Sequence, residues 1–378
     1  MLKETSSLFL TKAAVISVAC MFGLTYSLSA TLIALNLASM GLSETLIGAN
    51  AAMHAVGVLA MVFILPRLSV FFGLRPVVLF SLLLSAFLLF LFPALPFYLL
   101  WFPLRVLLGA ASEALFVLSE TWLNELSSEA TRGRTMGAYT ASLSAGFALG
   151  PLILSIIGAE GFAPYLTGTC LSVLAAVLIM MPGVRAPALT KPTHDNPMAY
   201  LKLAPLSLAA TALNASVETA GLTFLALYAL SLGWAENQAT GLMSIMMIGA
   251  IALQVPIGWL ADKIDRQRLV GILAGLSALG ALIWPLVLQS QAATYAILFV
   301  WGGAFVGIYT IMLAIVGSRF KGGDLVGIYA TMGLMWGGGA LLGPLLAGLS
   351  MQITLHGLPW FIAAICFAFM VMTFRLRT

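Results

Sequence analysis

Long apolar segments alternate with short polar breaks along the whole 378-residue chain. The apolar residues run continuously instead of alternating at every second position, which excludes the strands of an outer-membrane barrel. A helix that crosses a membrane needs about 20 mostly apolar residues, and most of these segments reach that length. The pattern therefore predicts twelve transmembrane helices, at 11–38, 45–65, 75–95, 97–122, 134–158, 161–182, 203–232, 236–261, 268–289, 292–317, 325–350 and 356–374.

Composition supports this prediction. Hydrophobic residues make up 61% of the chain and charged residues only 8%, against roughly 45–50% apolar residues in a soluble domain. The three cysteines have no metal-ligand or disulfide spacing and fall inside predicted helices, so no metal or other cofactor is expected. No phosphate-binding loop and no catalytic triad occurs, which argues against ATP-driven transport and against an enzyme.

The basic residues predict the orientation, because cytoplasmic loops retain positive charge during insertion. If the twelve segments all cross, sixteen of the seventeen basic residues fall on one side, while the loops of the other side carry only Glu44, Glu160 and Glu236. We therefore expect both termini in the cytoplasm and a multi-pass protein of the bacterial inner membrane. The net charge of +4 reflects this topology and implies no nucleic-acid partner. The sixteen are Lys3, Lys12, Arg67, Arg75, Arg132, Arg134, Arg185, Lys191, Lys202, Lys263, Arg266, Arg268, Arg319, Lys321, Arg375 and Arg377.

The longest polar break, 184–200, divides the chain into two predicted six-helix bundles, 1–183 and 201–378. The spacing Gly146-x3-Gly150-Pro151 returns as Gly339-x3-Gly343-Pro344, at an offset of 193 residues. Two halves with matching landmarks indicate an internal repeat, with a substrate path between the halves near the middle of the membrane. The glycines allow close helix contact and the prolines allow a bend, so both segments are candidates for moving contacts; ordinary tight packing is the alternative.

Three motifs resemble those of the major facilitator superfamily of secondary transporters. The stretch GWLADKIDRQR at 258–268 looks like that family's loop between the second and third helix of each half. Arg105-x3-Gly109 is similar to its fourth-helix arginine motif, and Gly137-x8-Gly146-x3-Gly150-Pro151 resembles the pattern of its antiporters. SETWLNE at 119–125, followed by Arg132-Gly133-Arg134, further resembles a little-characterised bacterial branch. The resemblance covers nearly the full length and implies two helical bundles that rock around a central cavity.

The resemblance also implies a cytoplasmic gate at the charged stretch. Asp262 would face the positive end of a neighbouring helix, and the basic residues would meet acids or lipid headgroups. The alternative is that the stretch only anchors a loop. The corresponding first-half stretch, LPRLSVFFGLR at 65–75, contains no acid, so any such gate is asymmetric. The candidate gate residues are Gly258, Asp262, Lys263, Asp265, Arg266, Arg268 and Glu120.

Ionisable residues inside the hydrocarbon region are costly and are candidates for function. Glu113 lies near the middle of its segment and is a candidate proton carrier, with a structural hydrogen-bonding role as the alternative. Glu120 shares its helix face but is closer to the cytoplasmic end, where pairing with Arg132 or Arg134 is the alternative.

Arg105, Asn214, Glu218, Tyr26 and Trp336 are further candidates for substrate binding or proton coupling. Glu218 follows Asn214 by one turn, so the two present polar atoms to one side; Glu218 would bind the substrate or titrate. Tyr26 and Trp336 could stack on a substrate, as could Trp301 and Tyr309, although packing is the usual role of such residues. His54, Asn36 and Gln254 are ambiguous. Arg105 lies too far along its helix to pair directly with Glu113.

These observations predict a secondary transporter that exchanges protons for a small, partly apolar organic solute, most simply as an exporter and a monomer. Two alternatives stay open. One is proton-coupled uptake of a small organic nutrient or acid, with Arg105 binding a carboxylate. The other is a membrane receptor that binds a ligand without transporting it.

Overall fold

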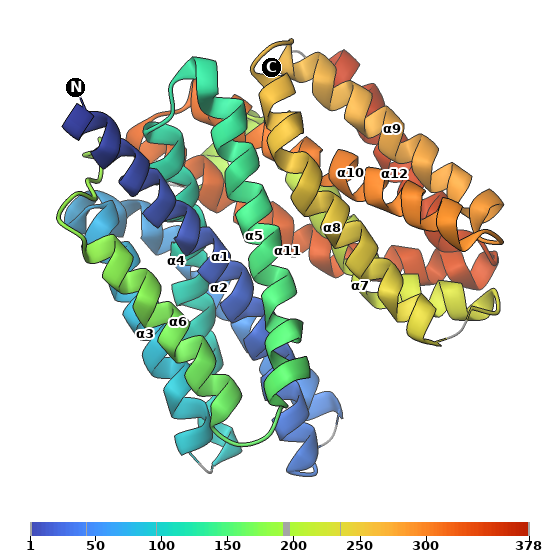
Figure 1. The fold of residues 1–378 in the computed structure, drawn as a ribbon, viewed down its shortest axis with the longest axis horizontal. Helices are drawn as coiled ribbons and strands as arrows, with labels where there is room; N and C mark the ends of the chain where they lie inside the picture. Colours follow the sequence, from blue (N-terminus) through green and yellow to red (C-terminus); the bar gives the residue numbers. More distant parts are fainter. Residues whose placement is uncertain (1, 43, 96, 192–196, 235, 377–378) are drawn as a thin grey trace. The chain divides into compact units, whose positions relative to one another are not determined.

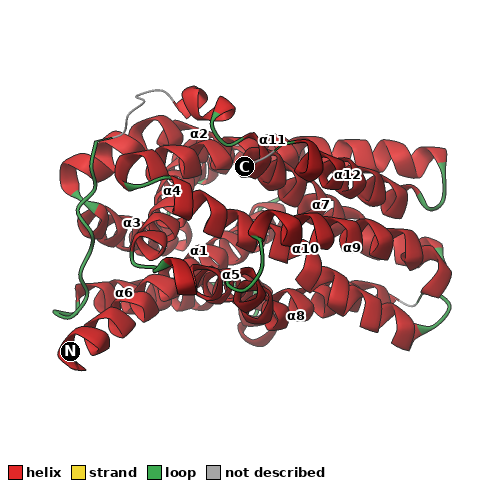
Figure 2. Cartoon of the chain, turned by 90° about the horizontal axis from the view of Figure 1, so that it is seen from above, coloured by secondary structure: helices red, strands yellow, loops and turns green. Residues whose placement is uncertain are grey.

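The computed structural model describes residues 2–42, 44–95, 97–191, 197–234 and 236–376. Within these ranges the chain forms α-helices, three short 3-10 helices and connecting loops, and no strand (Figures 1 and 2). The helices are α1 (Leu2–Ser39), α2 (Glu44–Phe72), α3 (Leu74–Ala94), α4 (Trp101–Glu125), α5 (Arg132–Ile157), α6 (Ala163–Met180), α7 (Pro205–Ser231), α8 (Glu236–Ala261), α9 (Arg266–Val287), α10 (Gln291–Arg319), α11 (Gly322–Ile353) and α12 (Gly357–Arg375).

Each predicted apolar segment coincides with one of these helices, so the prediction of an all-helical protein is confirmed. Among the described residues, eleven helices are long and apolar enough to cross a membrane. The number of crossings and the side on which the termini lie stay predictions. Residues 192–196 of the predicted linker at 184–200 lie outside the described residues.

Helix α3 illustrates why the fold needs a lipid surrounding. Its inner face buries Val78, Leu82 and Leu89, whereas its outer face exposes Phe80 and Phe87. A helix that is apolar on both faces is stable only where its outward side also meets an apolar medium. The exposed aromatic rings are therefore explained by contact with lipid tails, and the chain is an integral membrane protein.

The helices group into two compact units. Unit 1 comprises Met1–Leu126, Ser142–Met198 and Phe320–Gly333, and unit 2 comprises Ser127–Ala141, Ala199–Arg319 and Leu334–Thr378. Each unit therefore contains the beginning of one long helix whose remainder belongs to the other. The first turns of α5 are part of unit 2, and the first turns of α11 are part of unit 1.

Each unit has its own apolar core. In unit 1 a cluster that includes Leu32, Phe92, Trp101 and Tyr165 joins α1, α3, α4 and α6. In unit 2 a larger cluster joins α7, α8, α9, α10 and α12. Helix α9 lies beside α12 there, as Figure 1 shows. Trp301 belongs to this second core: its indole N–H donates to the Ser277 carbonyl at 2.8 Å, and its ring stacks on Phe305 at 4.9 Å.

Candidate functional site

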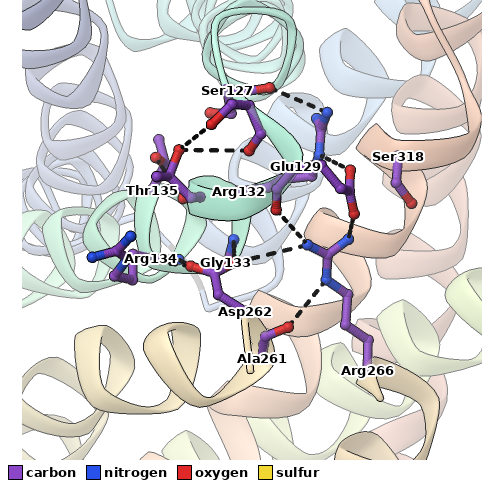
Figure 3. A network of polar contacts seen from close by, with 12 residues as sticks. Ser127, Glu129, Arg132, Gly133, Arg134, Thr135, Ala261, Asp262, Arg266 and Ser318 are labelled. Carbon is purple, nitrogen blue, oxygen red and sulfur yellow. Dashed lines mark hydrogen bonds and ion pairs between the residues drawn. The ribbon is translucent and has the colours of Figure 1, made fainter. Parts of the chain in front are cut away.

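Asp262, directly after α8, binds the beginning of α5 within unit 2 (Figure 3). Its carboxylate accepts hydrogen bonds from the backbone N–H of Gly133 at 2.7 Å and of Arg134 at 3.1 Å. The Arg134 side chain adds an ion pair at 3.3 Å. The first N–H groups of a helix have no partner inside the helix and carry partial positive charge, so a carboxylate satisfies both needs at once.

A second acid, Glu129, binds two arginines beside this contact. Arg266 donates to its carboxylate at 2.5 Å and to its backbone carbonyl at 3.2 Å. Arg132 pairs with the same carboxylate at 3.3 Å. Arg266 also lies 3.8 Å from Asp262. The two acids and three arginines therefore form one network that joins the segment before α5 to the segment between α8 and α9 (Figure 3).

The other residues of the charged stretch have separate local roles. Asp265 caps α9 by accepting from the backbone N–H of Arg268 at 2.8 Å. The Lys263 ammonium lies 5.9 Å from the centre of the Trp259 ring. An open groove of about 580 Å³ borders the network, and Asp262, Lys263 and Arg266 line it together with Glu129. Because water reaches this groove, it can replace these ion pairs at moderate cost.

Bare glycine backbones let α5 pack closely on two helices. In unit 2, a β-carbon at Gly133 would collide with Gly258 of α8, and one at Gly137 would collide with the backbone of Gln254. In unit 1, Gly146 and Gly150 lie in the same way against the backbone of α1. Pro151 follows without interrupting the helix.

Helix α11 repeats this arrangement on α7 in unit 2. The backbones of Gly339 and Gly343 contact those of Ala212 and Ser216, and the Ser216 hydroxyl donates to the Gly339 carbonyl at 3.1 Å. Pro344 lies inside the helix. The repeat found in the sequence therefore corresponds to two equivalent helix contacts, that of α5 with α1 and that of α11 with α7.

In unit 1 the beginning of α11 runs along the second half of α4. Glu125 accepts from the backbone N–H of Gly322 at 2.6 Å, and Asn124 donates to the Tyr329 hydroxyl. At the far end, a β-carbon at Gly333 would lie 2.5 Å from the Glu113 carboxyl. Residues 113–125 span about 18 Å of helix and residues 322–333 about 17 Å, so the two segments match in length. We call this contact the α4–α11 seam.

Glu113 is one of the buried acids of this seam. It is 4% exposed, and its Oε1 atom has no hydrogen-bond partner among the described residues. An isolated carboxylate in such a place costs several kcal/mol, so the contact with Gly333 is compatible with the neutral form.

Arg105 lies nearer the beginning of α4. It is 3% exposed and donates to the Ser29 hydroxyl at 2.9 Å. His54 of α2 lies within its electrostatic reach and packs edge-on against the Tyr26 ring, at 5.1 Å between ring centres. Arg105 and Glu113 therefore occupy separate surroundings on one helix.

The remaining candidates lie in both units. In unit 2, Asn214 donates to the Glu218 carboxylate at 3.4 Å, and Trp336 of α11 is half-buried. Tyr309 is buried in α10. In unit 1, Glu120 is fully buried on α4.

Of the ambiguous polar residues, Gln254 accepts from Thr310 at 2.6 Å, and the Thr310 hydroxyl lies 2.7 Å from that of Thr140. This buried chain of hydrogen bonds joins α8, α10 and α5 in unit 2. Asn36 of α1 donates to the backbone carbonyls of Leu32 and Ala159, which is a structural role.

Sequence reasoning missed two acids, Glu125 and Glu129. Both stand near the end of α4 beside ordinary polar loop residues, and their partners lie 197 and 137 residues further along the chain. One signal could have indicated Glu125. The first-half stretch at 65–75 contains no acid, which could have directed attention to other acids of the first half.

Together, the apolar helices, the buried charges and the charged contacts at helix ends define a polytopic membrane transporter. No cluster of acids, histidines or cysteines suited to a metal ion occurs among the described residues. The chain belongs to the Major Facilitator Superfamily, whose family model matches residues 15–329 and also 206–378. It is therefore a transporter and not an enzyme, and the resemblance found in the motifs is confirmed.

Relatives and solved structures agree with this family. The chain is 26% identical to the uncharacterized MFS-type transporter YfkF of Bacillus subtilis over 67% of its own length and 66% of that protein. It is 25% identical to the uncharacterized MFS-type transporter YcaD of Salmonella arizonae, over 73% and 72%.

The solved structures share the fold at lower identity. The fucose:proton symporter FucP of E. coli has a TM-score of 0.75 at 18% identity and covers 98% of this chain and 100% of its own. The proton:xylose symporter XylE has a TM-score of 0.75 at 15% identity, with coverage of 99% and 96%.

Proposed function

We propose that this transporter exchanges protons for a small, partly apolar organic solute by alternating access, and that it works as an exporter. The proposal includes twelve membrane crossings in two six-helix bundles, 1–183 and 201–378, and both termini in the cytoplasm. It places the monomeric protein in a bacterial inner membrane, in keeping with the bacterial relatives YfkF and YcaD.

The observation that carries the proposal is the buried carboxyl of Glu113 against Gly333, whose Oε1 atom has no hydrogen-bond partner among the described residues. Closing the α4–α11 seam removes water from this carboxyl and offers it no counter-ion. Seam closure and ionisation therefore oppose each other: a neutral Glu113 favours the closed seam, and an ionised Glu113 favours its separation. A helix movement that depends on a proton is the element that proton-coupled transport requires.

Two acids at helix ends would serve as the cytoplasmic latch. Asp262 holds the beginning of α5, and Glu125 holds the beginning of α11. Charged contacts at helix ends suit this role because water replaces them when the helices part, whereas an apolar contact would expose its surface at greater cost. Arg266, Glu129 and Arg132 strengthen the α5 side. Glu125 supplies the acid that the stretch 65–75 lacks.

Five residues are the proposed contacts of the solute: Arg105 and Tyr26 of unit 1, and Asn214, Glu218 and Trp336 of unit 2. The hydrogen bond between Asn214 and Glu218 holds these two polar side chains together. The half-buried rings of Tyr26 and Trp336 supply apolar area. This combination suits a molecule with an apolar body and one or two polar groups.

Export is the favoured direction because the glycine and proline spacing of α5 resembles that of antiporters. Proton-coupled uptake is a second candidate, and one observation favours it: FucP and XylE, which share the fold, are proton symporters by name. Both directions use the same protonation of Glu113 and differ in whether solute and proton cross together or in opposite senses.

The test is proton movement in sealed proteoliposomes that contain a pH-sensitive dye, screened against a panel of organic anions, cations and neutral compounds. We expect at least one compound to evoke proton flux in wild-type liposomes and none in protein-free liposomes. Proton flux opposite to the solute supports export, and flux with the solute supports uptake. Solute movement at an unchanged internal pH would contradict proton coupling.

A further inference from the structure

Within the part of the chain that the structure describes, one buried guanidinium on α4 has no counter-ion. Arg105 forms no ion pair with any described acid, and its Nε atom has no hydrogen-bond partner among the same residues. The groups that act on it electrostatically are Tyr26, Tyr165 and His54, none of which is a carboxylate. Arginine keeps its charge even when buried. A buried charge is normally paired, because leaving it alone costs several kcal/mol.

Glu113 cannot supply the missing negative charge. It lies eight residues further along the same helix, about 12 Å away along the axis. Its carboxyl is directed at Gly333 of α11. Arg105 therefore has no carboxylate partner among the described residues of unit 1, and a bound anion would supply the missing negative charge.

Two side chains within electrostatic reach of the guanidinium, His54 and Tyr165, have unused hydrogen-bonding groups. Both ring nitrogens of His54 and the hydroxyl of Tyr165 are buried without a hydrogen-bond partner among the described residues. Buried polar groups are bonded in the great majority of cases. Unsatisfied groups from α2, α4 and α6 around one cation thus indicate a binding site for a ligand that accepts hydrogen bonds.

An aromatic cluster adjoins this site. The Tyr26 ring lies 5.1 Å from His54 and 5.7 Å from Phe147, and Phe22 stacks on Phe116 at 4.8 Å. These four rings are half-buried, so the cluster has an open side. A ligand whose charged end reaches Arg105 would place its apolar part against these rings.

We propose that Arg105, with His54 and Tyr165, binds the carboxylate of an organic monoanion whose apolar body packs on Tyr26 and the phenylalanines. A single cation neutralises a single negative charge, which favours a carboxylate over a phosphate dianion. Bound water could satisfy the hydrogen bonds, but it would leave the charge uncompensated. This inference rests on the proposed transport function, because it specifies the class of the transported solute.

The experiment is thermal unfolding and calorimetric titration of the purified full-length protein in detergent. The probes are acetate, benzoate, the neutral analogue benzamide, and inorganic phosphate. We expect benzoate to raise the unfolding temperature in a concentration-dependent manner and acetate to do so more weakly. Benzamide and phosphate should have no effect at the same concentrations. Equal stabilisation by benzamide, or none by either carboxylate, would overturn the proposal.

Variants separate a binding role from a structural one. Arg105→Gln should weaken benzoate binding at least tenfold, as expected for the loss of a charge-assisted hydrogen bond. Without ligand it should unfold at the wild-type temperature or above, because it removes an unpaired buried charge. The control Arg75→Gln removes an arginine that binds backbone carbonyls at the end of α6, and it should lower the unfolding temperature while preserving benzoate binding. Unchanged benzoate binding in Arg105→Gln would contradict the proposed site.

The results distinguish the two proposals. If benzoate binds through Arg105 but moves no protons in proteoliposomes, the anion site stands and proton coupling fails. If only cationic or neutral compounds evoke proton flux and neither carboxylate binds, proton coupling stands and the anion site fails.

Discussion

The latch at Asp262 gives the sharpest prediction, because both carboxylate oxygens are used. One oxygen accepts from the Gly133 N–H at 2.7 Å and the other from the Arg134 N–H at 3.1 Å. Asparagine has one acceptor oxygen and one NH2 donor. In Asp262→Asn, one backbone N–H therefore faces the NH2 group in either orientation of the side-chain amide. The attraction of the negative charge to Arg134 and Arg266 is also lost.

The magnitude follows from these contacts. A hydrogen bond to a charged acceptor contributes about 1.5–3 kcal/mol. Losing one such bond shifts the equilibrium between latched and separated helix ends roughly 10- to 150-fold toward separation. The contact between Gly133 and Gly258 remains in the variant, so the fold itself should persist.

The assay is the rate of maleimide labelling at Ala261→Cys, a position that is 2% exposed, in protein lacking Cys20, Cys170 and Cys366. When opening and closing are fast, this rate follows the open population. We expect Asp262→Asn to raise the rate at least about tenfold, the lower end of the shift above. Asp265→Asn is the matched control, because asparagine caps a helix as well as aspartate does, and it should leave the rate within about twofold. Equal rates in the two variants would refute the reasoning.

Three further predictions concern the helix contacts. Gly137→Ala should lower the free energy of unfolding by about 1–3 kcal/mol, measured by denaturant unfolding, because the added carbon meets the Gln254 backbone; Gly338→Ala, with open space around it, should not. Gly333→Ala should displace the Glu113 carboxyl and slow solute-evoked proton flux in proteoliposomes, and wild-type flux would contradict the α4–α11 seam. Glu125→Ala should speed amide hydrogen exchange in the first turn of α11 by about tenfold or more, because Gly322 loses a charged acceptor; unchanged exchange would rule out a latch there.

Much of the fold could be predicted because the membrane imposes a simple rule. A helix must present about 20 apolar residues to lipid, so the limits of a segment such as 75–95 agree closely with α3 (Leu74–Ala94). Glycines four residues apart also indicated close helix contacts, because a residue without a β-carbon lets two helix backbones come into contact. Helix limits and glycine spacing can be predicted because each is determined by residues that are close together in the sequence.

The pairing of charges could not be predicted from the sequence. Glu129 binds Arg266, 137 residues away, and nothing near either residue specifies that partner. The sequence suggested Glu120 as a partner for Arg132 or Arg134, and it did not indicate that Arg132 also binds Glu129 or that Arg134 binds Asp262. Charge pairing depends on which helix ends meet, and that is a property of the tertiary fold.

The central claim is that protonation of Glu113 drives solute movement, and one comparison tests it most directly. Proteoliposomes with an identified substrate are assayed for substrate exchange at equal pH on both sides and for transport driven by a pH gradient. Glu113→Gln keeps the shape of a neutral carboxyl, so we predict that exchange persists and gradient-driven transport is lost, while Glu160→Gln in an exposed loop changes neither. Gradient-driven transport at the wild-type rate in Glu113→Gln would contradict the account.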